Sequence, residues 1–78
     1  MDKWIEVTIG EGLFPSERIV HLRTVDGVIS LFVSTSQLDE SRRALKVRVL
    51  DEDLRYALVQ VSSQDGGTTA KVERVEVR

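Results

Sequence analysis

The chain contains no cysteine, one histidine and one proline among its 78 residues. Without thiols there is no disulfide and no thiolate metal ligand, and a single histidine excludes the common zinc sites that use several histidines. We therefore expect no cofactor and no bound metal. Small domains usually supplement a limited core with such cross-links or with oligomerisation, so a homo-oligomer, a dimer or higher, is the remaining expectation.

Long apolar runs are also absent, since none approaches the roughly 18 residues of a membrane span. The segment Met1 to Trp4 leads directly into a strand pattern and not into the charged and then apolar regions of a signal peptide. We therefore expect a cytoplasmic protein with no membrane partner. Eleven Lys and Arg against thirteen Asp and Glu give a net charge of −2, with the signs mixed along the chain. This balance does not favour a polyanionic partner such as nucleic acid.

Two alternating apolar stretches flank Asp26-Gly27 between residues 19 and 34. A two-residue type I′ turn at Asp26-Gly27 predicts a hairpin in which Val25 faces Val28 and His21 faces Phe32. In this register the inward-facing side chains share one side, as a single buried face requires. These side chains are Val20, Leu22, Ile29, Leu31 and Val33.

The other side of this hairpin is unusually apolar. Ile19, Val28 and Phe32 lie on it, beside the polar residues His21 and Arg23. A face in contact only with water would hold fewer large apolar side chains. We therefore expect that either a second layer of the fold or another chain covers it.

The remaining strands follow from the same alternation. It predicts strands over residues 4–9, 44–50 and 54–62, with a polar turn at 51–53 and a flexible connection over 62–69. The register of the second hairpin stays open: a two-residue turn pairs Val47 with Leu58, and a three-residue turn pairs Val47 with Ala57. In the last strand the apolar parity changes after Val72, which predicts a β-bulge near Glu73-Arg74. Residues 36–43 form a short helix or a loop.

About six short strands joined mostly by local hairpins predict an all-β domain spanning residues 1–78. The expected architecture is a small antiparallel barrel or a compact sandwich with at most one short helix. Its size and strand number are similar to those of SH3-like and OB-like small barrels. This likeness concerns architecture and implies no function.

No arrangement of residues in the sequence indicates catalysis. His21 ordinarily titrates near neutrality, but the predicted register gives it no acidic partner, and no Gly-x-Ser-x-Gly elbow is present. The triplet Asp51-Glu52-Asp53 lacks the alternating acids and the glycine of a calcium loop, so we interpret it as a solvated turn. We expect a protein that is not an enzyme and has no catalytic residue.

The apolar loop tip Leu13-Phe14 either covers an open end of the barrel or docks in a partner. Trp4 lies on an otherwise polar face of the first strand, and tryptophan is frequent in interface hot spots. We therefore expect a non-catalytic, self-associating interaction or binding module that contacts another copy or another protein. Its candidate contact residues are Trp4, Leu13, Phe14, Ile19, His21 and Phe32.

The alternative function is a weak nucleic-acid or ligand-binding barrel. Its candidate residues form the densest basic cluster of the sequence: Arg42, Arg43, Lys46 and Arg48. Small barrels bind single strands with basic and aromatic side chains on one sheet face, but here the aromatic residues are scattered along the chain. The arrangement in space discriminates between the two functions. The basic residues converge on one exposed face in the alternative, whereas the apolar side of the first hairpin stays uncovered in the interaction module.

Overall fold

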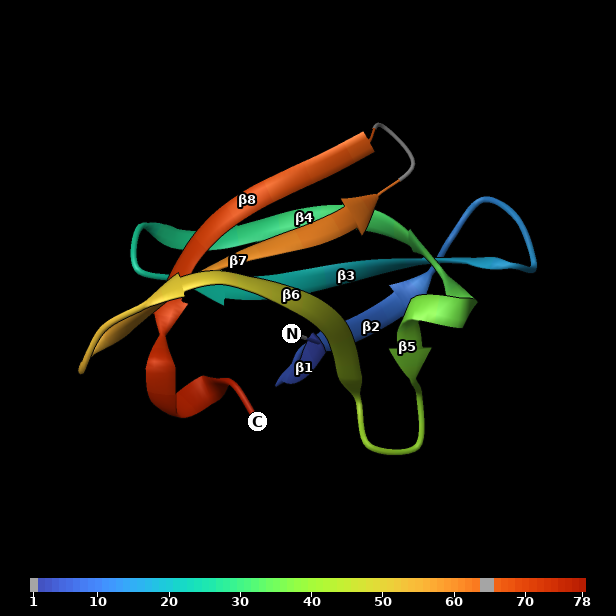
Figure 1. Cartoon of the computed structure of the whole chain (residues 1–78). Coiled ribbons are helices and arrows are strands. Elements are labelled where there is room, and N and C mark those ends of the chain that lie inside the picture. Colours follow the sequence, from blue (N-terminus) through green and yellow to red (C-terminus); the bar gives the residue numbers. More distant parts are fainter. Residues whose placement is uncertain (1, 64–65) are drawn as a thin grey trace.

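The computed structural model of the chain describes residues 2–63 and 66–78. Its strands are all antiparallel and form two sheets (Figure 1). The larger sheet contains, in spatial order, β1 (Asp2–Glu6), β6 (Ala44–Glu52), β7 (Tyr56–Ser63) and β8 (Gly66–Glu73), with β5 (Leu38–Asp39) also pairing with β6. The smaller sheet has the order β2 (Thr8–Glu11), β3 (Glu17–Thr24) and β4 (Gly27–Ser34).

These eight strands confirm the all-β antiparallel fold. The two sheets form a sandwich-like arrangement, and the described residues form no closed barrel. The strand number exceeds the expected six because the predicted first strand divides at Val7 between the two sheets and because the two-residue strand β5 was not predicted. Val7 donates its N–H to the carbonyl oxygen of Arg43 at 2.9 Å, which lies outside both ladders. The described part of the chain contains no helix with the length and apolar character needed to cross a membrane.

The core lies between the two sheets and follows the alternation of the sequence. Side chains at every second position of β1, β3, β6, β7 and β8 face inward, because successive residues of a strand point to opposite faces. The buried cluster consists of Ile5, Val7, Val20, Leu22, Val33, Leu45, Val47, Ala57, Val59, Val61, Ala70 and Val72. In the central strand β7, the side chains of Ala57, Val59 and Val61 are buried, and Leu58 lies on the outer side.

The β3–β4 hairpin forms where it was predicted, but its turn and register differ. Thr24 pairs with Gly27 and His21 pairs with Ser30, so the turn residues are Val25 and Asp26 and not Asp26 and Gly27. Gly27 has a φ of 119°, whereas Asp26 has no positive φ, which excludes the predicted type I′ turn. The side chain of Thr24 explains the difference: Oγ1 accepts the N–H of Asp26 at 3.1 Å and donates to the carbonyl oxygen of Gly27 at 2.7 Å.

Neither predicted register of the β6–β7 hairpin is correct. Val49 pairs with Val59 and Asp51 pairs with Leu58, so Leu50 is an extra residue in a β-bulge of β6. β6 continues through the acidic residues to Glu52, and the turn lies at residues 53–55, later than predicted. Its stability comes from Asp53, whose Oδ1 accepts the N–H groups of Arg55 and Tyr56, both at 2.8 Å.

The predicted bulge near Glu73-Arg74 is a 3-10 helix, η2 (Arg74–Glu76). This turn changes the apolar parity, and it allows Val77 to form an antiparallel bridge with Ile5. The predicted connection over 62–69 is also shorter than expected, because β7 extends to Ser63 and β8 begins at Gly66. Asp65, which was part of that prediction, lies outside the described residues.

Residues 36–43 contain no α-helix, within a region that the structure describes completely. A 3-10 helix, η1 (Thr35–Gln37), begins after Ser34, whose Oγ accepts the N–H of Ser36 at 3.3 Å. Ser34 is therefore the capping residue of η1. The two-residue strand β5 then pairs with the start of β6.

Candidate interaction surface

The outer face of the smaller sheet is apolar and exposed. On β4, Val28 and Phe32 point outward and are 65% and 39% exposed. Ile19 and His21 of β3 lie beside them on the same face and are partly exposed. In the described part of the chain, no second layer of the fold covers this face. Of the two expectations, a second layer or another chain, the first is therefore wrong.

Two contacts fix the side chains of this face. Ile19 pairs with Phe32 across the ladder, and its Cγ2 lies 2.9 Å from the position that a Cβ on Gly10 would occupy. Gly10 therefore gives room to Ile19. His21 lies opposite Ser30, with 2.7 Å between Nδ1 and Oγ. The predicted contact of His21 with Phe32 is wrong because the register differs from the predicted one.

β4 is also an edge strand. Among the described residues it pairs only with β3, over all eight of its positions. In an antiparallel pair, alternate residues direct their N–H and C=O groups away from the partner strand. About half of the backbone groups of β4 are therefore directed toward the open edge of the sheet.

The other edge strands are less suited to pairing with another strand. β1 has only five residues, of which Asp2, Lys3 and Glu6 are charged. β8 presents Thr69, Lys71 and Glu73 on its outer side, and charged side chains on an edge oppose pairing. β2 has only four residues, of which Gly10 is one. In contrast, β4 carries no charged residue from Gly27 to Ser34. Among the edge strands of the described residues, β4 is the one that combines eight residues with no charge.

The loop between β2 and β3 adjoins this surface and does not cover the core. Leu13 and Phe14 are 79% and 64% exposed, so the interpretation in which they cover an open end of the fold is wrong. The loop is held by Glu17, a buried residue whose Oε1 accepts the N–H of Leu13 at 3.0 Å. The N–H of Glu17 is in turn donated to the carbonyl oxygen of Phe14 at 3.0 Å. Sequence reasoning missed Glu17, because nothing in its neighbours indicated that this carboxylate is buried.

Trp4 does not belong to this surface. It lies in β1, in the other sheet, with the guanidinium carbon of Arg42 at 5.7 Å from the ring centroid. Its main chain pairs with Arg78: the N–H of Trp4 donates to the carbonyl oxygen of Arg78 at 2.7 Å. Of the six predicted contact residues, the structure thus brings together Ile19, His21 and Phe32. It places Leu13 and Phe14 on the adjoining loop and Trp4 elsewhere.

The basic cluster is only partly assembled. Lys46 and Arg48 point outward from β6, and Lys46 pairs with Trp4 in the ladder. Two of the cations already have acidic partners, since Arg42 lies 3.1 Å from Asp39 and Lys46 lies 3.7 Å from Asp2. Arg43 lies in the preceding turn with a positive φ of 52°. The cluster therefore offers a phosphate backbone little uncompensated charge.

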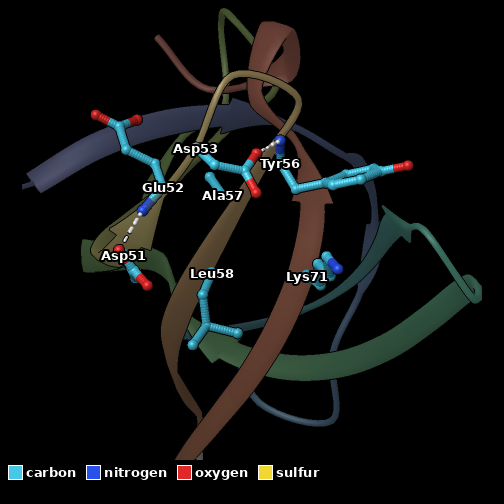
Figure 2. Close-up of a pocket in the computed structure, with 7 residues that line it drawn as sticks. All are labelled: Asp51, Glu52, Asp53, Tyr56, Ala57, Leu58 and Lys71. Atoms are coloured by element: carbon cyan, nitrogen blue, oxygen red, sulfur yellow. Dashed lines mark hydrogen bonds between the residues drawn. The ribbon is translucent and has the colours of Figure 1, made fainter.

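A hollow of about 300 Å³ beside the acidic turn is a second candidate site (Figure 2). Tyr56 is the aromatic residue that lines this hollow, and the Nζ of Lys71 already lies over its ring, 4.5 Å from the centroid. The carboxylate of Asp53 accepts the N–H groups of Tyr56 and Arg55, which hold its pKa below the usual value. Asp51 accepts the N–H of Glu52 at 2.9 Å. The carboxylates of Asp51 and Asp53 thus accept main-chain N–H groups of the neighbouring turn. In residues 2–63 and 66–78, no three His, Asp or Glu side chains form a group suited to a metal ion.

No protein-family model matches the chain, and no curated protein or solved structure is significantly similar to it.

Proposed function

We propose that this protein is a non-catalytic interaction module that binds an extended polypeptide segment along β4. The observation that carries the proposal is the free edge of β4, eight residues without charge that expose Val28 and Phe32. An added strand would satisfy the outward backbone groups of β4 by main-chain hydrogen bonds. Its alternate side chains would lie beside Val28 and Phe32 on the same face of the sheet.

The surroundings of β4 support this mode of binding. The ladder with β3 holds β4 extended over its whole length, so little conformational freedom is lost when a partner strand adds. Ile19 lies next to Phe32 and widens the apolar surface beyond one strand. The exposed side chains of Leu13 and Phe14 add a second apolar contact near the start of β3.

The absence of catalysis is part of the proposal. The one serine–histidine contact of this surface, between Ser30 and His21, lies on the exposed outer face of a sheet. Nucleophilic catalysis also needs a carboxylate behind the ring and donors for an oxyanion. In the described residues, the ring of His21 has no ion pair with a carboxylate. We interpret the contact as one that orients two surface side chains.

The test is amide hydrogen exchange with and without a strand peptide. The probe is a capped synthetic peptide with residues 27–34 followed by two lysines for solubility. We expect the amides of β4 to exchange more slowly as the peptide is added, while those of the central strand β7 do not change. Exchange rates in β4 that are independent of peptide concentration would contradict the proposal.

Two variants provide the controls. Val28→Lys places a charge on the exposed edge and should weaken peptide binding several-fold without unfolding the chain, because Val28 is a surface residue. Val75→Lys makes the same change at an exposed position in η2 and should leave binding as in the parent. Equal loss of binding in both variants would mean that the peptide does not add to β4.

A further inference from the structure

We infer that the partner of β4 is a second copy of this chain, whose β4 adds antiparallel with its Ser30 opposite Ser30. The inference rests on the proposed function and specifies its partner. The two smaller sheets then form one continuous sheet of six strands across a two-fold axis. Three properties of β4 support this pairing: its charge, its side-chain pattern and its length.

The charge pattern permits self-pairing. A symmetric dimer places each surface patch against itself, so any charge on the edge would meet a like charge. β4 has no Asp, Glu, Lys or Arg between Gly27 and Ser34, and therefore no repulsion arises along its length. A second copy of β8, which carries Lys71 and Glu73, would not share this property.

The side-chain pattern selects the register. Only registers that keep outward residues opposite outward residues preserve the two faces of the sheet. With Ser30 opposite Ser30, Val28 of each copy lies opposite Phe32 of the other. Shifting one strand by two residues would instead place Phe32 opposite Ser30 and leave Val28 opposite Ser34. The Ser30-centred register is therefore the one that pairs the two exposed apolar side chains.

The same register also places apolar residues opposite each other on the inner face, and it keeps His21 and Arg23 of the two copies apart. Ile29 of one copy lies opposite Leu31 of the other, and both are only partly buried within one chain. His21 pairs with Ser30 inside each chain, so the two His21 residues are separated by three strand spacings, about 14 Å. Arg23 lies opposite Val28 and is therefore in a different row from Arg23 of the second copy.

The extent of the interface predicts a weak dimer. One eight-residue strand is about 27 Å long, and an interface based on it is at the small end of specific contacts. We expect the mass in sedimentation equilibrium to rise from 8.8 kDa toward twice that value as the concentration increases from about 10 µM to about 1 mM. Val28→Lys should stay monomeric in this range, and Val75→Lys should behave as the parent.

Single-cysteine variants test the register, because the chain has no cysteine of its own. Opposite residues in an antiparallel pair have Cα atoms about 4.5–5.5 Å apart, within the range that a disulfide spans. Ser30→Cys should therefore form a disulfide-linked dimer under mild oxidation. Val28→Cys should not link to itself, since the two Val28 positions are about 14 Å apart along the strands. Mixing Val28→Cys with Phe32→Cys should give the mixed disulfide.

The outcomes separate this inference from the proposed function. A chain that stays monomeric at every concentration, but whose β4 amides are protected by the peptide, would overturn the second copy as partner and leave strand binding intact. A dimer in which Val28→Cys links to itself and Ser30→Cys does not would overturn the inferred pairing. If neither the peptide nor a second copy protects β4, both proposals fail.

Discussion

Gly27 is the residue whose backbone conformation the β3–β4 hairpin requires. Its φ of 119° is rarely adopted by L side chains, while a Cβ at this position would meet nothing within 4 Å. The cost of a side chain therefore comes from the backbone and not from a clash. Gly27→Val should lower the free energy of unfolding by about 1 kcal/mol or more, measured by urea denaturation.

A control for this prediction is Thr8→Val, which places the same valine side chain at an exposed strand position whose φ is not positive. It should change the free energy of unfolding by less than about 0.5 kcal/mol. If Gly27→Val were as stable as the parent, the positive φ at residue 27 would not be needed for the hairpin.

Asp53 gives the molecule an acid-sensitive turn. The N–H groups of Tyr56 and, next, Arg55 hold the pKa of its carboxyl below 3.8 in the folded chain. Because the folded-state pKa is the lower one, the carboxylate stabilises the fold above the unfolded pKa. This contribution disappears as the pH falls through the folded pKa. An NMR titration should therefore place the Asp53 midpoint below 3.8, and Asp53→Asn should reduce the loss of Tm below about pH 4. A midpoint at or above 3.8 would contradict this account.

At the scale of the element, alternation predicts faces better than it predicts partners. Val20, Leu22 and Val33 are buried as predicted, because the predicted and observed registers differ by two residues, which preserves both faces. The register itself depends on two contacts. The side chain of Thr24 donates to the carbonyl oxygen of Gly27, and the N–H of Val25 donates to the carbonyl oxygen of Lys71 in the other sheet at 3.0 Å. The second of these contacts exists only after the two sheets meet.

A change of apolar parity shows that a strand is interrupted, but it does not say how. The change after Val72 comes from the 3-10 helix η2, which replaces the predicted bulge. The bulge that is present, at Leu50 of β6, left no such signal. There Val49 remains partly buried and Leu50 is exposed, so the sequence resembles an ordinary strand that runs into a polar turn.

At the scale of the whole molecule, the sequence predicted the apolar surface but not its limits. The unusual outer side of the first hairpin was evident because Ile19, Val28 and Phe32 share it. That β4 lies at an edge, and that Trp4 lies in the other sheet, follows only from the order of the strands. Strand order depends on contacts between distant segments, for which a single sequence carries no local pattern.

The distribution of charge over the molecule predicts no useful affinity for nucleic acid. Arg42 and Lys46 are engaged by Asp39 and Asp2, and the net charge is −2. We expect no mobility shift with single-stranded DNA or RNA at about 150 mM salt. A clear shift that disappears in the double variant Arg42→Glu, Arg43→Glu would favour the alternative function.

The pairing of the two chain ends has a mechanical consequence. Trp4 and Arg78 exchange two main-chain hydrogen bonds, of 2.7 and 2.8 Å, next to the antiparallel bridge between Ile5 and Val77. In an antiparallel pair the two strands run in opposite directions, so the chain before Trp4 and the chain end at Arg78 lie at the same end of this short ladder. A pulling force applied to the ends therefore acts on these hydrogen bonds one after the other. It does not act on all of them at the same time, as it would in shear geometry. The C-terminal segment should detach at low force while β7, between two strands, keeps its pairs. Under tension, the main-chain pairing between Trp4 and Arg78 should therefore break before the strands of the core separate.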